Sequence, residues 1–162
     1  MGTRRQWLRK LAVSAVLISL AFNVLAAETG GSDGAPSAMG YVRMYVDDQD
    51  VSHFGDDELP LVFEDYAPPA NPIAVHALQD VDGATIIQIP GGAFENWHPA
   101  PRRQFAFILQ GVVEVTVGDG EARRFSPGDI VLLEDTTGRG HTTRVVSDED
   151  HIAVMVPVTG GP

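Results

Sequence analysis

The sequence predicts one all-β domain of the sandwich or barrel type, and three observations support this prediction. Short apolar runs separated by turn residues fill the chain from residue 40 onward. The run Val112–Val117 alternates valines with polar residues, which is typical of a strand with one buried face. No window carries an apolar stripe at helical spacing over a useful length. Roughly ten short strands in about 120 residues favour a jelly roll.

The order of the elements follows from the turn residues. Pro68, Pro69 and Pro72 exclude a helix between the first two apolar blocks. Asp82-Gly83 predicts a hairpin turn between the two runs that flank it, 73–78 and 85–89. The expected strands are Tyr41–Val46, Ile73–Leu78, Thr85–Ile89, Phe105–Leu109, Val112–Val117, Glu121–Phe125, Ile130–Leu133, Thr142–Val146 and Ile152–Val156.

Residues 1–27 predict a cleaved export signal. A basic start precedes an apolar run, Leu11–Leu25, that is too short to span a bilayer comfortably. An uncleaved membrane anchor is the alternative. The stretch TRRQWLRK, residues 3–10, resembles the twin-arginine export motif of bacteria, which implies export of the folded protein to the periplasm or the medium. A Gly-rich flexible linker is expected at residues 28–39, followed by the domain at residues 40–162.

The charge of the chain limits its partners. The chain has 11 basic and 22 acidic residues. Cleavage of the signal would remove four basic residues and leave a net charge of −15. So acidic a body repels nucleic acid and anionic lipid, and we expect neither as a partner, nor a membrane after cleavage. The chain has no cysteine, so it has neither disulfides nor a thiolate ligand.

Two motifs in the second half resemble those of the small single-domain bacterial cupins. The first runs from His98 to Gly111, and it carries Ala100 and Gln104 where the family has its second histidine and its glutamate. The second motif runs from the turn Pro127-Gly128-Asp129 to His141. The gap before His141 is about two residues longer than in many cupins. The resemblance implies an all-β, cupin-type double-stranded β-helix, or jelly-roll barrel, and a homodimer.

The resemblance also implies candidate metal ligands. They are His98, Gln104 and His141, which could hold one divalent ion less tightly than three imidazoles and a carboxylate would. Glu95, Glu134 or Asp135 could supply the missing charge.

Arg102, Arg103 and Trp97 are the candidate ligand-binding residues. An arginine at the barrel mouth would pair with a carboxylate or phosphate of a ligand. At least one of the two arginines is expected to pair with a carboxylate of the protein instead. Trp97 would form an apolar wall over the ligand, or belong to the core. We expect His53 and His76 to be structural or exposed, and His151, in an acidic turn, to be solvated.

Two functional classes stay open. In the first, the barrel binds a small polar or carboxylated molecule, with or without a divalent metal. In the second, the protein is a metal-dependent cupin enzyme of the isomerase, lyase or dioxygenase type that acts on a small carboxylated substrate. The sequence assigns no catalytic residue. The broken histidine pair at Ala100 favours the first class, and the twin-arginine-like signal favours the second.

Overall fold

The computed structural model describes residues 38–159. The export signal and most of the linker lie outside these residues. All regular elements of the described part are strands, so the predicted all-β fold is confirmed. They are β1 (Ala38–Val46), β2 (Ser52–Pro60), β3 (Val62–Glu64), β4 (Ile73–Val75), β5 (Thr85–Ile89), β6 (Phe94–His98), β7 (Gln104–Gln110), β8 (Val113–Thr116), β9 (Ala122–Phe125), β10 (Ile130–Leu133), β11 (His141–Val145) and β12 (His151–Pro157).

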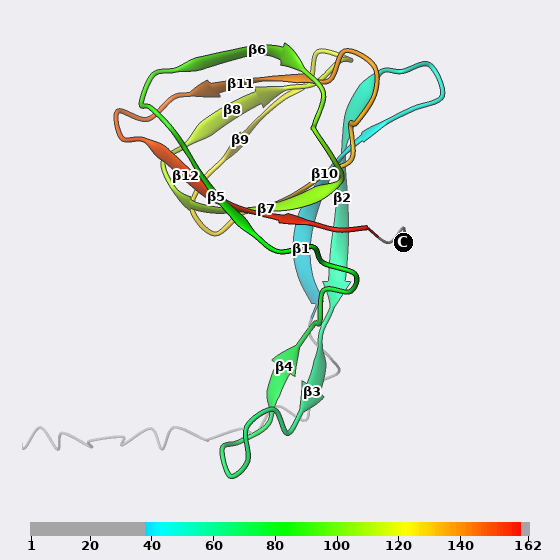
Figure 1. Ribbon diagram of the computed structural model, residues 1–162, viewed down its shortest axis with the longest axis vertical. Coiled ribbons are helices and arrows are strands. Elements are labelled where there is room, and N and C mark those ends of the chain that lie inside the picture. The colour runs from blue at the N-terminus through cyan, green and yellow to red at the C-terminus, as the bar shows by residue number, and fades with distance from the viewer. Residues whose placement is uncertain (1–37, 160–162) are drawn as a thin grey trace, which may run out of the picture. The chain divides into compact units, whose positions relative to one another are not determined.

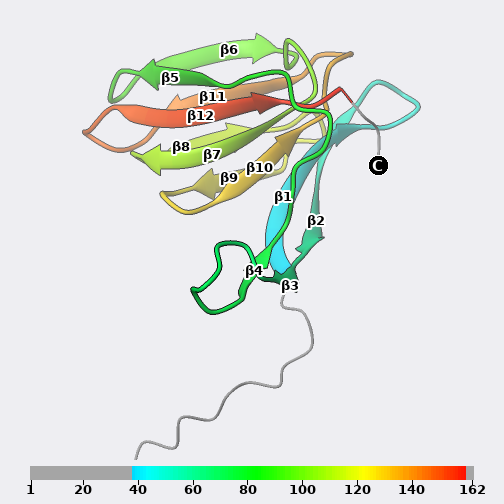
Figure 2. The ribbon, with the colours of Figure 1, turned by 60° about the horizontal axis from the view of Figure 1, so that its bottom comes forward.

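Two sheets face each other and enclose the core. The first sheet has six strands in the order β2-β1-β10-β7-β12-β5, and the second has four in the order β6-β11-β8-β9. Figure 1 shows the four-stranded sheet above and the strands of the six-stranded sheet below, and in Figure 2 the strands of the six-stranded sheet lie in front of those of the four-stranded sheet. Among the described residues, no helix is long and apolar enough to cross a membrane.

Strict alternation along the strands determines which side chains enter the barrel. On β12, His151, Ala153, Met155 and Pro157 are buried, while the residues between them are partly exposed. The register then aligns inward side chains across the sheet, because Met155 pairs with Ala106 and Ala106 with Val131. On these strands the interior is therefore lined by residues at every second position, as the pleat of a sheet requires. On β6 an irregularity in the pairing with β11 interrupts this alternation.

One predicted hairpin is wrong. Ile73–Val75 pairs with Val62–Glu64 in a separate two-stranded sheet, and Thr85–Ile89 pairs with β12 instead. The Asp82-Gly83 turn therefore does not join two paired strands. Pairing with β12 packs Ile87 and Ile89 against the main core, whereas 73–75 belongs to a separate two-stranded sheet.

Candidate functional site

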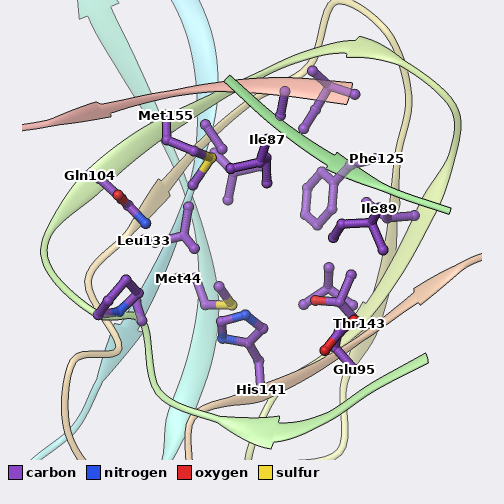
Figure 3. A pocket seen from close by; sticks show the side chains of 18 of the residues that line it. Met44, Ile87, Ile89, Glu95, Gln104, Phe125, Leu133, His141, Thr143 and Met155 are labelled. Carbon is purple, nitrogen blue, oxygen red and sulfur yellow. The ribbon is translucent and has the colours of Figure 1, made fainter. Parts of the chain in front are cut away.

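A cavity of about 350 Å³ lies between the two sheets. Most of its wall is aliphatic, including Met44, Ile87, Leu133 and Met155, and Phe125 adds an aromatic ring (Figure 3). The polar wall residues are few: Thr85, Glu95, His98, Arg102, Gln104, His141, Thr143 and His151. A mostly apolar cavity with a few polar groups is the usual form of a small-molecule site.

His141 is the most firmly held polar side chain at the cavity. It opens β11, is 4% exposed, and its Nδ1 lies 2.6 Å from Oδ2 of Asp135. Asp135 is fully buried, and its other oxygen, Oδ1, has no hydrogen-bond partner in the described part. The carboxylate accepts the Nδ1 proton, so Nε2 is the nitrogen that remains for a ligand.

The loop before His141 packs directly against β6. Gly140 has a φ of +74°, and a Cβ placed there would collide with the backbone carbonyl of His98. Only glycine combines this backbone conformation with so close an approach. Gly140 thus holds the start of β11 beside the end of β6.

His98 lies next to His141. The two residues pair in the β6–β11 register, and their ring centroids are 4.6 Å apart. Nδ1 of His98 lies 2.6 Å from the backbone oxygen of Asn96. A carbonyl oxygen only accepts, so Nδ1 carries the proton and Nε2 remains for a ligand. The two histidines of the separate sequence motifs are therefore adjacent at one cavity.

Gln104 faces these histidines from the opposite sheet. It is buried, and its side chain points into the cavity that His141 also lines (Figure 3). Gln104 opens β7 and pairs with Leu133 and Pro157 on its two neighbouring strands. Ala100, at the family's second histidine position, is also buried and contributes only a methyl group to the wall. Its N–H donates to the backbone oxygen of Asp135 at 3.0 Å, which ties the loop after β6 to the loop before β11.

The two arginines predicted for ligand binding have different positions. Arg102 lines the cavity. Arg103 instead donates from Nε to Oε1 of Glu134 at 2.8 Å, and Arg43 binds the other oxygen of the same carboxylate at 2.7 Å. Glu134 is thereby occupied by two cations and does not line the cavity, although it follows β10 directly.

Trp97 does not line the cavity either. The guanidinium of Arg139 lies 3.8 Å from its ring centroid, a cation–π contact. Inward positions on β6 belong to Glu95 and His98, which both line the cavity. Trp97 instead helps to hold the loop that leads into β11.

His151 is the polar wall residue that the sequence reading placed wrongly. It was expected to be solvated, yet it is 4% exposed, because β12 begins at this residue and its pairing with Ile89 turns the ring inward. Burial lowers the pKa of its imidazole, and a hydrogen bond with the Gln110 backbone opposes this only in part. Nδ1 has no hydrogen-bond partner within residues 38–159.

His53 and His76 lie away from the cavity. His53 bonds Asp119 at 2.6 Å and Asp47 at 3.0 Å, which raises its pKa, and His76 bonds the backbone oxygen of Pro60.

The cavity offers few side chains that could hold a divalent ion. Nowhere in residues 38–159 do three or more His, Cys, Asp or Glu side chains converge to hold a metal. Beside His98 and His141 the cavity offers the neutral amide of Gln104 and the carboxylate of Glu95, which lies on β6 beside Thr143. Asp135 is used by His141, and Glu134 by two arginines. These side chains alone do not complete a charged metal site of the kind that holds a divalent ion tightly.

Comparison with known proteins identifies the fold. Residues 77–148 match the family of EutQ-like cupin domains. The domain has the cupin fold. No curated protein matches the chain. The matched segment includes β5 to β11 and therefore His98, Gln104 and His141.

Solved structures described as cupins or as double-stranded β-helix domains are similar to this one at a coarse level. A cupin 2 conserved barrel domain protein from Salinispora arenicola is 20% identical, with a TM-score of 0.41 over 63% of this chain and 76% of that chain. A protein with a double-stranded β-helix domain from Klebsiella pneumoniae is 24% identical, with a TM-score of 0.40 over 59% and 87%. A cupin described as a sugar phosphate isomerase, from Silicibacter pomeroyi, is 16% identical, with a TM-score of 0.39 over 48% and 50%.

Proposed function

We propose that this cupin barrel binds a small carboxylated molecule whose apolar body fills the cavity. The observation that carries the proposal is the arrangement of the wall. Arg102, His98, His141 and Gln104 supply polar groups to a cavity whose other surface is largely aliphatic. A carboxylate would bind the polar groups, and the rest of the molecule would pack against the aliphatic surface.

Arg102 is the natural partner of the carboxylate. Within residues 38–159 it forms no hydrogen bond or ion pair, whereas Arg43, Arg103 and Arg123 all bind protein carboxylates. In a chain with 22 acidic residues, an arginine at a cavity without an acidic partner is available to a ligand. A guanidinium binds a carboxylate through two parallel hydrogen bonds.

The two imidazoles and the amide add polar recognition. The Nε2 atoms of His98 and His141 accept hydrogen bonds when the rings are neutral and donate them when the rings are protonated. The Gln104 amide can do both. Hydroxyl groups of a ligand would therefore find partners beside the carboxylate, which favours a hydroxylated acid.

The aliphatic walls supply affinity. Burial of about 100 Å² of apolar ligand surface contributes about 2.5 kcal/mol.

Glu95 limits which acids fit. Its carboxylate lines the cavity three residues before His98, next to Thr143, with which it pairs in the β6–β11 register (Figure 3). A second carboxylate on the ligand would meet the like charge of Glu95. We therefore expect monocarboxylates to bind better than dicarboxylates of the same size.

Binding titrations with metal-free protein test this function. A panel of small hydroxylated and plain monocarboxylates is titrated by calorimetry into the wild type and into Arg102→Gln. We expect the substitution to weaken binding about tenfold or more, because one charge-assisted pair is lost. Arg124→Gln is the matched control, since Arg124 pairs with Glu114 on β8 and does not line the cavity. An equal loss in both variants, or no binding by any acid, would contradict the proposal.

The metal-dependent enzyme is the second candidate, and it rests on the Asp135–His141 pair. Histidines that ligate metals usually donate their other nitrogen to a carboxylate or a carbonyl, as His141 and His98 do here. Elemental analysis of protein from its native host, with His98→Ala and His141→Ala, separates the two functions. One metal ion per chain that is lost in both variants would favour the enzyme, and metal-free wild type would favour the binder.

We also propose that the protein acts after export. The proposal rests on the twin-arginine-like stretch in residues 3–10. Replacement of Arg4 and Arg5 by lysine should abolish the exported fraction, measured by blotting of cell fractions. Unchanged export would contradict a twin-arginine route.

A further inference from the structure

His53 lies outside the cavity and is held by carboxylates at both nitrogens of its ring. Nδ1 lies 2.6 Å from Oδ2 of Asp119, and Nε2 lies 3.0 Å from Oδ2 of Asp47. Asp47 belongs to the turn between β1 and β2, and Asp119 to the turn between β8 and β9. A carboxylate only accepts hydrogen bonds, so both ring nitrogens carry a proton. We call these three residues, which join two turns through an imidazolium, the His53 clamp.

Both carboxylates of the clamp are also fixed by backbone groups. The other oxygen of Asp47 accepts two backbone N–H groups of its own turn, at 2.8 and 3.0 Å. The other oxygen of Asp119 accepts one, at 2.7 Å. A neutral imidazole has a single N–H, so the second carboxylate would then face a lone pair. Loss of one proton from His53 therefore breaks one of the two bonds between the turns.

The surroundings of His53 determine when that proton is lost. Within the described residues, the charged groups that act on the ring are Asp47 and Asp119. Tyr45 of β1 adds a ring whose centroid lies 5.8 Å away, and Arg43, which lies over that ring, is bound to a carboxylate of its own. The hydrogen bonds to the two aspartates raise the pKa of His53 above its ordinary 6.5. The clamp is complete below this raised pKa and loses a bond as the pH rises through it.

The residue before His53 continues the contact into the barrel. Neighbouring residues of a strand point to opposite faces, and Ser52 is buried whereas His53 is partly exposed. The Ser52 hydroxyl accepts the N–H of Gly118 at 2.6 Å and donates to the backbone oxygen of Gly140 at 2.6 Å. One hydroxyl thus joins the turn after β8 to the residue that precedes His141.

The turn between β1 and β2 also touches the loop that leads into β11. In Figure 1 this turn is cyan and the loop is orange. Thr137 donates from Oγ1 to Oδ1 of Asp50 at 3.1 Å. Gly138 has a φ of +67°, and a Cβ placed there would collide with the backbone oxygen of Asp50. The same loop carries Asp135, which holds the ring of His141. The turn that the clamp fixes is therefore a support of the loop that orients His141.

We propose that the His53 clamp is a pH-sensitive support of the cavity: protonated His53 holds the loop before β11 in place, and loss of the proton loosens this loop and weakens ligand binding. The proposal rests on the proposed function, because affinity for a carboxylated ligand is its readout at the cavity. The connection is contiguous, since the clamp fixes the turn, the turn fixes the loop through Ser52 and Asp50, and the loop fixes His141. Affinity should therefore fall as the pH rises.

Hydrogen exchange of the ligand-free full chain tests the support itself. The amide of Ala100 donates to the Asp135 backbone oxygen and reports on the loop, and the amide of Gly118 reports on the Ser52 bond. In the wild type, both protection factors should fall about fivefold between about pH 6 and about pH 9, after correction for the intrinsic exchange rate at each pH. This is the low end of coupling between sites, because the clamp is partly exposed.

Three variants separate the clamp from other effects of pH. His53→Gln cannot carry the charge, so its protection factors should be low at both pH values. Ser52→Ala should also be low at both, because it removes the bond to Gly140. His76→Gln is the matched control, since His76 is exposed and lies away from the clamp, and it should behave as the wild type. Protection that falls equally in the wild type and in His53→Gln would overturn the proposal, as would wild-type protection in Ser52→Ala.

Calorimetric titration of the acid that binds best supplies the second readout. His98 and His141 can titrate in the same range, so the comparison is between proteins at matched pH. The ratio of the affinities at about pH 6 and about pH 9 should be about fivefold larger in the wild type and in His76→Gln than in His53→Gln. Equal ratios in all three would overturn the proposal. Absence of binding by every acid would overturn the proposed function and the link to affinity, while the exchange data still decide whether the clamp supports the loop.

Discussion

Two histidines line the same cavity with opposite surroundings. His141 is bonded to a buried carboxylate, and its Nε2 is left for a ligand. His151 lies at the start of β12 among apolar neighbours, without a partner for Nδ1 and with a pKa that burial lowers. Equal exposure therefore does not mean an equal role. A partner that fixes the ring prepares His141 to bind a ligand. His151 has no partner at Nδ1, and its ring packs as part of the apolar wall around it.

Among the substitutions that test this difference between the two histidines, Gly140→Ala should have the largest effect on stability. The new Cβ would collide with the His98 carbonyl at a positive φ, so β6 and β11 must separate. We expect a loss of about 4 kcal/mol in the free energy of unfolding, measured with urea. Gly120→Ala is the control, because Gly120 also has a positive φ but open space around its Cβ position. It should cost about 1–2 kcal/mol. Equal losses in both would show that the β6–β11 contact matters little.

Asp135→Ala should have the next largest effect. It leaves His141 buried without its partner, and the loss of one member of such a pair costs about 3 kcal/mol of unfolding free energy. Ligand binding should weaken as well, because the His141 ring is no longer fixed. Asp135→Asn, which keeps an oxygen for Nδ1–H, should recover most of the stability. A stable Asp135→Ala protein with unchanged ligand affinity would show that the pair is not what distinguishes His141.

His151→Leu should have the smallest effect at neutral pH and a clear one in acid. The pKa of His151 is lowered from 6.5 in the folded protein, so the unfolded chain binds the proton more readily. The wild type therefore loses stability as the pH falls below 6.5, until the folded pKa is reached. His151→Leu should lose less between pH 7.5 and 5.5 in urea titrations. His53, whose pKa is raised, shifts both proteins alike. An identical pH dependence in both would contradict a buried, neutral His151.

Most strands could be predicted from the sequence, and the strands that were missed lack the apolar alternation on which the prediction depends. β8, β10 and β12 were expected to within two residues, because apolar alternation marks strands that border the core. β2 was not expected, since it contains Gly55, Asp56 and Asp57, and it is a strand because it pairs with β1 over its full length. β6 was not expected either, because most of its residues are exposed and its sequence therefore shows no apolar alternation.

The candidate site could be predicted in part. Spacing within each motif singled out His98, Gln104 and His141, and all three line one cavity. Sequence alone could not separate Arg102 from Arg103, because the choice depends on where β7 begins and on Glu134, which directly follows β10. It also could not find the pairing of Asp135 with His141, which depends on a loop conformation that Gly140 permits.

The sequence by itself determined the fold class and the inward or outward direction of residues on the core strands, because these depend on local pattern and composition. Tertiary structure decided which strands are neighbours, which carboxylates are already occupied by arginine or histidine, and which of the five histidines are buried. These properties depend on contacts between residues far apart in the chain, and the register that creates such contacts is set by packing of the whole barrel.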